Sequence, residues 1–356
     1  KKVLALVLAF ACAFTMFAGA AFTDQADIKV KSDVVDTLVS LGVIEGFEDG
    51  SFQPNGTVTR AQMAKMIYVL RTGNSDASAY NDDKTSFTDI GSHWARGYIK
   101  YCQSLGIIAG KSNTKFVPNE KVSAQEAAKM LLVTLGYNAQ KAGLVGTGWA
   151  SKTNALADEN GLLEDVNTSF TGACPRQYAA QLIYNTIFAN TVVLRDGEYT
   201  NLSFTGNGKN DTVGEKYMNL KKVDGGIMEK CAAVDGKDYY TVHTTTTASP
   251  YNKVPTDASD LLGQQIKVLV KLDSDNHVDS VYGVYADEDS KVVATGLLGD
   301  FELDGSDKIK LNGTSYKLDG AQDSNVVYTA QQKPASVAKT NFSALAALAV
   351  KGTITP

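Results

Sequence analysis

"SLGVIEGFEDGSFQPNGTVTRAQMAKMIYVL", residues 40–70, leads from a glycine-rich turn through a Phe and a Pro into an amphipathic helix. Residues 104–132, "SLGIIAGKSNTKFVPNEKVSAQEAAKMLL", repeat this pattern 64 positions later without a gap. A weaker third copy aligns "PRQYAAQLI" at 175–183 with "TRAQMAKMI" at 59–67. Self-similarity at a fixed spacing is typical of a duplicated supersecondary unit. The sequence therefore predicts three consecutive units of one fold.

Each unit is predicted to be a helix, an irregular loop and a second helix. The first helix carries one apolar stripe, at Val34, Val35, Leu38 and Leu41 in the first copy and at Trp94, Tyr98, Tyr101 and Leu105 in the second. Gly42 and Gly106 suit the left-handed end of that helix. The second helix opens with capping-box pairs, Thr59 with Gln62 and Ser123 with Glu126. Because one unit cannot bury two apolar faces, the copies are expected to pack on one another.

Arg60 stands in the first turn of the second helix of the first copy, where free amides and the helix dipole favour an anion. Two interpretations carry equal weight. The guanidinium pairs with a nearby carboxylate such as Glu48 or Asp49, or it helps to hold an anionic ligand beside the amides. Charge placement alone leaves both open.

"FTDIGSHWARGYIKYCQSLGIIAG" at 87–110, followed by F-x-P and in the first copy by a "TRAQ" helix start, closely resembles the S-layer homology (SLH) module of bacterial surface proteins. The resemblance divides the chain into module 1 at 21–72, module 2 at 84–138 and a degenerate module 3 at 146–190. It implies a pseudo-threefold bundle whose grooves bind a secondary cell wall polymer linked to peptidoglycan, often through a pyruvylated glycan.

In that family the arginine of a Thr-Arg-Ala-Glu motif is a principal ligand contact, which corresponds to Arg60 and Arg176 here. The predicted polymer-binding residues are Arg60, Arg176, Thr59, Gln62, Asp89 and Trp94. Two of them have a favoured structural reading. We expect Trp94 to pack on the helix stripe rather than to form a sugar platform, and Asp89 to cap the helix that contains Trp94 rather than to line a groove.

This sequence departs from the family pattern at three places. Ala124 replaces the arginine in module 2, and Pro175 stands where Thr59 caps in module 1. Module 1 also lacks the His-Trp-Ala stretch that module 2 carries at 93–95. At most two grooves therefore keep an arginine.

Beyond residue 190 the pattern changes from helical to alternating. Residues 264–287 alternate around an Asp-Ser-Asp-Asn turn, 308–318 carry an Asn-Gly hairpin signal, and "GKDYYTVHTTTT" reads as a further strand. Residues 344–350 suit a terminal helix. We predict a multidomain α+β protein with an N-terminal helical bundle and a β-rich region at 191–356, as one or two small domains.

Residues 1–20 read as a secretory signal, with Lys1 and Lys2 before an apolar run and a cleavage site near Ala20. The protein is expected to be secreted, to be held at the cell wall or S-layer, and to keep no membrane association after cleavage. The chain has 34 basic and 39 acidic residues, a net charge of -5, without a basic cluster. This balance argues against nucleic acid as a partner and requires local contacts for an anionic polymer.

We predict no catalytic residue, metal site or cofactor. "DSDNHVD" at 273–279 fails the calcium-loop spacing, because Val278 and Val284 stand where glycine and glutamate are needed. The histidines at 93, 243 and 277 lack a second histidine at metal-ligand spacing. No Gly-x-Ser-x-Gly elbow occurs.

The favoured function is a non-catalytic cell-surface protein, anchored non-covalently to a secondary cell wall polymer. In it the β-rich region assembles a surface layer or spaces other material, as an S-layer or envelope structural component. The alternative is an SLH-anchored extracellular enzyme acting on carbohydrate, whose catalytic part is cryptic in the β-rich region or lies beyond the C-terminus.

Overall fold

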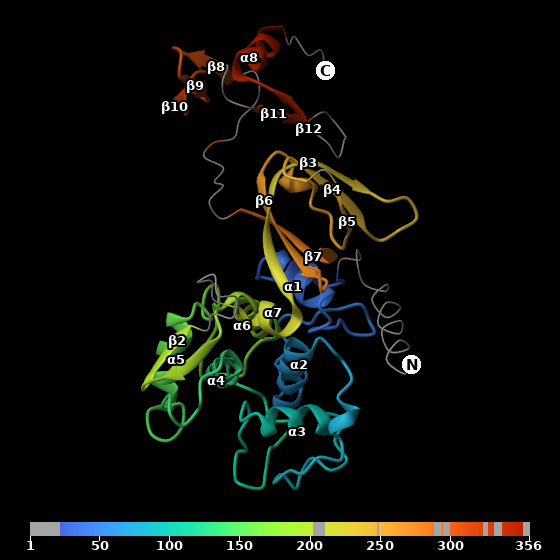
Figure 1. Ribbon diagram of the computed structural model, residues 1–356, viewed down its shortest axis with the longest axis vertical. Coiled ribbons are helices and arrows are strands. Elements are labelled where there is room, and N and C mark those ends of the chain that lie inside the picture. Colours follow the sequence, from blue (N-terminus) through green and yellow to red (C-terminus); the bar gives the residue numbers. More distant parts are fainter. Residues whose placement is uncertain are drawn as a thin grey trace. The chain divides into compact units, whose positions relative to one another are not determined.

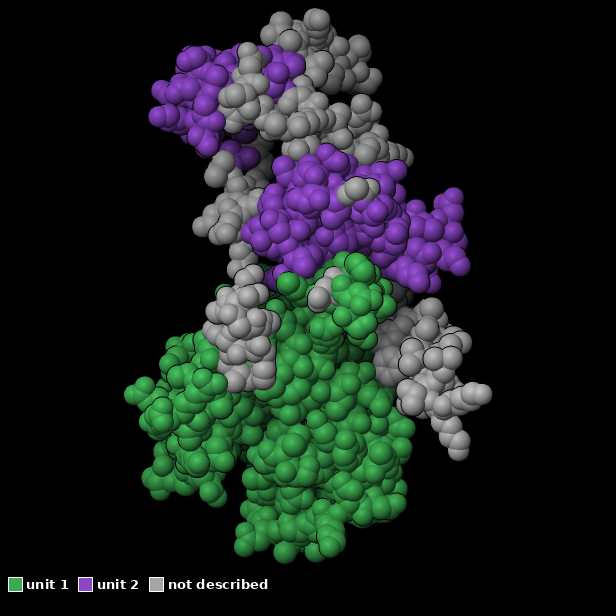
Figure 2. Space-filling view, viewed as in Figure 1, with its two compact units in different colours: residues 1–221, 269–283 green, residues 222–268, 284–356 purple. Residues whose placement is uncertain are grey.

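The computed structural model describes residues 22–201, 211–247, 249–275, 277–287, 294, 300–322, 327–330 and 337–351 (Figure 1). The predicted signal at 1–20 lies outside the described residues. The chain divides into two compact units, residues 1–221 with 269–283 and residues 222–268 with 284–356 (Figure 2). Helices dominate the N-terminal half and strands the C-terminal region, which confirms the predicted α+β class.

The helices are α1 (Ser32–Ser40), α2 (Arg60–Thr72), α3 (Arg96–Ser104), α4 (Ala124–Leu135), α5 (Trp149–Glu159), α6 (Arg176–Phe188), α7 (Val213–Met218) and α8 (Phe342–Lys351). Short 3₁₀ turns occur at Gln25–Asp27, Ser78–Tyr80 and Ser259–Leu261. The strands are β1 (Val192–Arg195), β2 (Glu198–Asn201), β3 (Leu220–Ala233), β4 (Tyr240–Thr244), β5 (Tyr251–Val254), β6 (Gln265–Leu272), β7 (Val278–Ala286), β8 (Phe301–Asp304), β9 (Lys308–Leu311), β10 (Thr314–Lys317), β11 (Val327–Ala330) and β12 (Val337–Thr340). Within the described residues, no helix has the length and apolar character that crossing a membrane requires.

A closed ring of backbone hydrogen bonds joins the extended segments that lead into α2, α4 and α6. The amide of Val58 donates to the carbonyl of Cys174 (3.1 Å), Cys174 donates to Val122 (2.8 Å), and Val122 donates to Val58 (2.9 Å). Antiparallel bridges flank the ring, at Thr57 with Pro175, Thr59 with Lys121 and Ser123 with Ala173. Because each segment gives its amide to one neighbour and its carbonyl to the other, the ring leaves no member unpaired.

The first turn of each of these helices extends the contact to the loop of another module. Arg60 N donates to Glu120 O (2.9 Å), Gln125 N to Phe170 O (3.0 Å) and Arg176 N to Gly56 O (2.7 Å). The first four amides of a helix have no partner within it, so a neighbouring carbonyl is a suitable acceptor. Each helix start is thus completed by a loop that lies far away in the sequence.

The predicted capping boxes of α2 and α4 are present. Thr59 Oγ1 accepts from Gln62 N (3.1 Å) while Thr59 N donates to Gln62 Oε1 (2.8 Å). Ser123 and Glu126 make the same two bonds, at 3.2 and 2.9 Å. At α6 the residue before the helix is Pro175, which provides no side-chain cap.

The loops between the paired helices are built around two buried phenylalanines. Phe52 and Phe116, at corresponding positions in modules 1 and 2, are completely buried. Each meets the phenylalanine of its own "FTD" segment, Phe22 or Phe87, at a centroid distance of 5.4 Å. The repeated Phe residues are therefore the packing centres of their loops.

The predicted stripe on the first helix of module 2 is wrong at both of its ends. Trp94 is 55% exposed and Leu105 is 44% exposed. The helix α3 begins only at Arg96, so Trp94 lies in the preceding turn and not on the face that meets the core. Tyr98 and Tyr101 do pack, edge-on to Tyr68 with centroids at 5.2 and 4.9 Å.

The first compact unit, residues 1–221 with 269–283, carries the helices α1 to α7 and is called the helical unit below. Its helical part continues past residue 190. The helix α7 packs on α2 and α6, and the guanidinium of Arg71, near the end of α2, lies 4.1 Å over the ring of Tyr217. Arg71 Nη1 also donates to the hydroxyl of Tyr217 at 2.9 Å. On the other side Gly136 touches the carbonyl of Val192 so closely that a Cβ would stand 2.2 Å from it. Val192 and the helix α7 are therefore packed on the modules.

The strands form four sheets. A five-stranded sheet has the order β5-β4-β3-β6-β7, and a three-stranded sheet has the order β10-β9-β8. Two hairpins, β1-β2 and β11-β12, complete the set among the described residues. The predicted Asn-Gly turn joins β9 to β10, with Asn312 and Gly313 both at positive φ (49° and 79°) and Leu311 paired with Thr314.

Phe116→Ala should lower the free energy of unfolding of the helical unit by about 3–5 kcal/mol, because it removes a completely buried aromatic ring. Urea unfolding followed by tryptophan fluorescence measures this, since Trp94 and Trp149 both lie in that unit. Leu105→Ala, at an exposed position, is the control and should change the value by at most about 0.5 kcal/mol. Equal losses in both variants would contradict the assigned core.

Candidate functional site

Arg60 crosses from the start of α2 into the loop of module 2. Its Nε donates to the carbonyl of Phe116 (2.9 Å) and its Nη2 to the carbonyl of Ala109 (2.6 Å). The guanidinium lies 4.5 Å from the centre of the Phe116 ring, and the residue is only 3% exposed. Of the two interpretations from the sequence, pairing with Glu48 or Asp49 does not describe these contacts, since the acceptors are backbone carbonyls.

Arg176 makes the corresponding contacts from the start of α6 into the loop of module 1. Its Nη2 donates to the carbonyl of Glu45, and its guanidinium lies over the rings of Phe47 (4.9 Å) and Phe52 (5.3 Å). Glu45 and Phe52 correspond to Ala109 and Phe116. The residue is 7% exposed. Both arginines therefore connect a helix start to a loop that is distant in sequence.

Burial governs the protonation of both guanidinium groups. Desolvation lowers the pKa of Arg60, against the opposing charges of Glu126, Glu120 and Asp89. It lowers the pKa of Arg176 to about 10, so both groups remain cationic at neutral pH. Within the described residues, Nε of Arg176 has no hydrogen-bond partner. One donor of this group is thus unused.

Asp89 does not cap the helix that follows it, so the favoured capping prediction is wrong. Its carboxylate accepts from the amides of Phe116 (3.0 Å) and Val117 (2.8 Å), whereas α3 begins after Ala95 without a side-chain cap. Val117 has φ of 60°, a left-handed conformation that is costly for a β-branched residue. Two successive amides exposed by such a turn attract an anion, and here the anion is Asp89.

Asp24 repeats the arrangement in module 1, where it accepts from the amides of Phe52 and Gln53, each at 2.8 Å. Gln53 has φ of 56°. For Asp89, partial burial by itself raises the pKa, but the two amides outweigh it and hold the pKa below its usual value. The aspartate of each "FTD" segment thus secures the turn after the buried phenylalanine.

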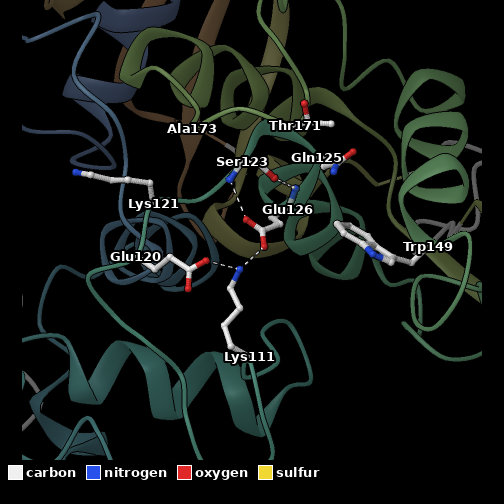
Figure 3. A pocket seen from close by; sticks show the side chains of 9 residues that line it. All are labelled: Lys111, Glu120, Lys121, Ser123, Gln125, Glu126, Trp149, Thr171 and Ala173. Carbon is white, nitrogen blue, oxygen red and sulfur yellow. Dashed lines mark hydrogen bonds and ion pairs between the residues drawn. The ribbon is translucent and has the colours of Figure 1, made fainter.

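A pocket of about 280 Å³ opens beside the start of α4 (Figure 3). It is lined by Lys111, Glu120, Lys121, Ser123, Gln125, Glu126, Trp149, Thr171 and Ala173. The first six of these residues lie between positions 111 and 126 and the last three between positions 149 and 173. An aromatic side chain together with several polar groups is suited to a ligand with apolar and hydroxyl-bearing surfaces.

The pocket contains a three-residue ion-pair cluster. Lys111 Nζ lies 2.6 Å from Glu120 Oε1 and 2.8 Å from Glu126 Oε1, and Figure 3 shows the lysine reaching up between the two carboxylates. Burial alone lowers the pKa of Lys111, but bonds and charges from both glutamates outweigh it and raise the pKa. Burial raises and Lys111 lowers the pKa of Glu126, with a net decrease. Both Lys111 and Glu126 are therefore charged at neutral pH.

The sequence-predicted residues Thr59, Gln62 and Trp94 occupy positions that correspond to Ser123, Glu126 and Trp149 of this pocket. The polar groups of Thr59 and Gln62 described above bond to each other in the capping box. Trp94 is exposed on a turn that His93 secures by accepting from the amide of Ala95 at 3.1 Å. Trp94 meets Tyr98 edge-on with ring centroids 6.1 Å apart, so part of the expected packing is present, and its exposed face is available to a ligand.

None of the nine residues that line the pocket was among the predicted binding residues, and the misses include Lys111, Glu120, Glu126 and Trp149. One signal could have found Trp149, because the pair Trp149-Ala150 repeats the pair Trp94-Ala95. The ion-pair cluster gave no such signal. Charged residues in a loop are ordinary in sequence, and only the fold brings these together.

Comparison with known proteins identifies two segments of the N-terminal helical region. The S-layer homology domain family matches residues 21–64 and 86–128. The chain is 29% identical over 204 residues to the "Cell surface protein" of Thermoanaerobacter kivui, which covers 56% of this chain and 26% of that protein. It is 29% identical over 168 residues to the "Surface layer protein" of Brevibacillus choshinensis, covering 46% and 15%.

A relative with an enzyme name is also similar. The "Exoglucanase XynX" of Acetivibrio thermocellus is 26% identical over 181 residues, which covers 47% of this chain and 16% of that protein. The chain thus spans about a quarter or less of the length of these relatives. It contains two S-layer homology domains, and these matches indicate a secreted surface protein associated with the cell wall.

Arg60→Ala should lower the free energy of unfolding of the helical unit by about 2–3 kcal/mol, because it leaves two carbonyl oxygens without their donor. Arg60→Lys should recover only part of this loss, since a lysine cannot reproduce the planar two-bond contact. Urea unfolding measures both. Lys84→Ala, at an exposed position, is the control, and an Arg60→Ala loss no larger than the control would contradict the bracing role.

Asp89→Asn should lower stability at pH 7 by about 1–2 kcal/mol, because the amide side chain replaces a charged acceptor of two backbone bonds. The folded-state pKa of Asp89 lies below its ordinary value of 3.8, so its stabilisation is present at neutral pH and is lost as the pH falls through the folded pKa. The gap between wild type and variant should therefore narrow below about pH 4. Unfolding curves from pH 7 to pH 3 measure it, with Asp82→Asn as the control; a constant gap would contradict the assignment.

Proposed function

We propose that this protein is anchored non-covalently to a peptidoglycan-linked secondary cell wall polymer, and that residues 146–190 form a third, degenerate module of the anchoring body. The proposal for module 3 is supported by the backbone ring. Cys174 takes the place in it that Val58 and Val122 take in the other modules, and Arg176 repeats the cross-module contacts of Arg60.

The pocket beside α4 is the observation that carries the binding function. It lies between two modules, has the tryptophan and hydrogen-bonding groups that a sugar requires, and is open to solvent. Groups of this kind bind neutral or charged glycans by stacking and hydrogen bonding. Trp94, exposed at the corresponding position of module 2, supplies a second contact surface.

The two arginines contribute to binding mainly indirectly, because their contacts fix where the helices α2 and α6 begin. Their exposed fractions are 3% and 7%, so most of each guanidinium is shielded from solvent. The guanidinium of Arg176 lies over the ring of Phe47, which lines a separate open pocket of about 490 Å³, while Nε itself is buried. Direct contact with a carboxylate of a pyruvylated sugar is therefore proposed for Arg176 ahead of Arg60.

The β-rich region acts without catalysis in this proposal, as part of a surface layer or as a spacer at the wall. The surface-layer relative favours that role. The relative named as an exoglucanase supports one competing function, that of a wall-anchored enzyme acting on carbohydrate. The release of reducing sugar from purified wall polysaccharide by the full chain separates the two, and turnover would favour the enzyme.

Retention of the full chain on purified cell wall sacculi should fall about tenfold in the double variant Trp94→Ala/Trp149→Ala, which corresponds to about 1.4 kcal/mol. A sedimentation assay at several protein concentrations measures it. Leu105→Ala removes an exposed apolar side chain elsewhere in module 2 and should leave retention unchanged. Sacculi stripped of their secondary polymer should retain none of the proteins, and equal retention of double variant and wild type would contradict the proposed surfaces.

A further inference from the structure

We infer that Lys129 is a positioning residue, whose ammonium group fixes the indole ring of Trp149 as the aromatic wall of the pocket beside α4. The inference rests on the proposed function, because it concerns how the tryptophan of that pocket is made ready for a glycan. It follows from the contact between the two side chains and from the residues that stand at the corresponding positions of the repeat.

The ammonium of Lys129 lies over the indole of Trp149. Its Nζ is 5.1 Å from the centre of the ring, which is within the distance at which a cation is attracted to the electron-rich face of an aromatic ring. Lys129 is partly buried on α4, which packs on α5, the helix that begins at Trp149. Partial removal from water strengthens such a contact. The pair therefore joins the two helices at the wall of the pocket.

The two side chains stand differently to the pocket. Trp149 lines it, and Figure 3 shows the indole reaching from α5 in the direction of Glu126. Lys129 is not one of the nine residues that line the pocket. The ammonium thus holds the ring from outside the pocket, and the part of the ring that lines the pocket stays available to a ligand.

A substitution in the preceding loop leaves Lys129 without the partner that its counterpart has. In module 1 the corresponding lysine is Lys65, which pairs with Glu45 at 2.9 Å. Ala109 stands in module 2 where Glu45 stands in module 1. The methyl group of Ala109 cannot draw an ammonium toward the loop, so the cation of Lys129 is left to the indole.

The one carboxylate of α4 is already engaged. Glu126 Oε1 lies 2.8 Å from Lys111 Nζ, and its Oε2 accepts from the amide of Ser123 at 2.9 Å. Burial lowers the pKa of Lys129, and the charge of Glu126 opposes this without outweighing it. Glu126 therefore acts on Lys129 from a distance, whereas the indole contacts it.

The backbone at Trp149 does little to orient the indole. The helix α5 begins there after Gly148, which has φ of 82°, and no side chain caps the helix. At Trp94 the turn is secured by His93, which accepts from the amide of Ala95. Gly148 stands at the position that corresponds to His93 and has no side chain for this role. A contact from the neighbouring helix is therefore needed to orient the ring.

A cation against an aromatic wall occurs at a second pocket of the helical unit. Phe47 lines the open pocket of about 490 Å³, and the guanidinium of Arg176 lies 4.9 Å from the centre of its ring. The cation comes from a helix and the ring from another segment, as with Lys129 and Trp149. The same arrangement thus accompanies two aromatic side chains that line pockets.

A ring that is held in place before binding loses less conformational freedom when a sugar stacks on it. Sites of this kind depend on contacts behind the binding residue as well as on the binding residue itself. Removal of the cation should therefore weaken binding even though the indole is still present.

Trp94→Phe leaves Trp149 as the single tryptophan of the full chain, so that its fluorescence reports on this ring alone. In that background Lys129→Gln removes the charge and introduces the residue that α6 carries at the corresponding position, Gln181. Quenching of Trp149 by acrylamide should increase, because the ring loses the contact that holds and covers it. In the chain with both tryptophans, Lys129→Gln should lower retention on purified cell wall sacculi about twofold to fivefold, as the loss of one cation–π contact predicts.

Lys129→Arg is the conservative variant. A guanidinium also binds to the face of an indole, so this variant should restore both quenching and retention to the values of the parent chain. Lys65→Gln is the matched control in α2, where the lysine pairs with Glu45, and it should change neither quantity. Urea unfolding of each variant verifies that the helical unit is folded under the conditions of both assays.

Unchanged quenching in Lys129→Gln, with or without a loss of stability, would overturn the inference, because the lysine would then only stabilise the fold. Equal effects of Lys129→Gln and Lys129→Arg would also overturn it. So would full retention of Lys129→Gln under conditions in which Trp149→Ala is released from the sacculi. Quenching is measured without sacculi, so the expected quenching together with full retention of Trp149→Ala would reject the binding role of this pocket and leave the positioning of the ring intact.

Discussion

Three backbone hydrogen bonds, through Val58, Val122 and Cys174, join segments that are more than fifty residues apart in sequence into one closed ring. Closure matters because a short extended segment in isolation has unpaired amides and carbonyls on both edges. In the ring each edge is satisfied by a neighbour of the same kind. The starts of α2, α4 and α6 are thereby fixed relative to one another, and the surfaces that could bind a glycan depend on that placement.

Two arginines, Arg60 and Arg176, and two aspartates, Asp24 and Asp89, stabilise the loops around this ring. Each "FTD" aspartate fixes the strained turn that follows a buried phenylalanine, and Arg60 and Arg176 then lie against those phenylalanines from another module. A guanidinium can stack on a ring and donate to carbonyls at once, which a lysine cannot do as well. The pattern that looks like a ligand motif in sequence is therefore also a structural brace.

Much of the fold could be predicted from the sequence because it depends on local and repeated signals. The capping boxes, the left-handed glycines and the Asn-Gly hairpin each specify one local backbone conformation. The placement of Trp94 and Asp89 could not be predicted from the sequence. The position of Trp94 depends on where α3 begins, and the role of Asp89 depends on which amides face its carboxylate. The cluster of Lys111, Glu120 and Glu126 was hidden for a related reason, since its members meet only when the loop folds back on α4.

The ring also sets an order of events for a chain that emerges from its N-terminus. Val58 and Val122 can pair as soon as both have appeared, but neither is fully bonded until Cys174 arrives more than a hundred residues after Val58. Contacts this distant in sequence are slow to form, because loop closure must come first. The ring can therefore close only after the segment around Cys174 has been synthesised.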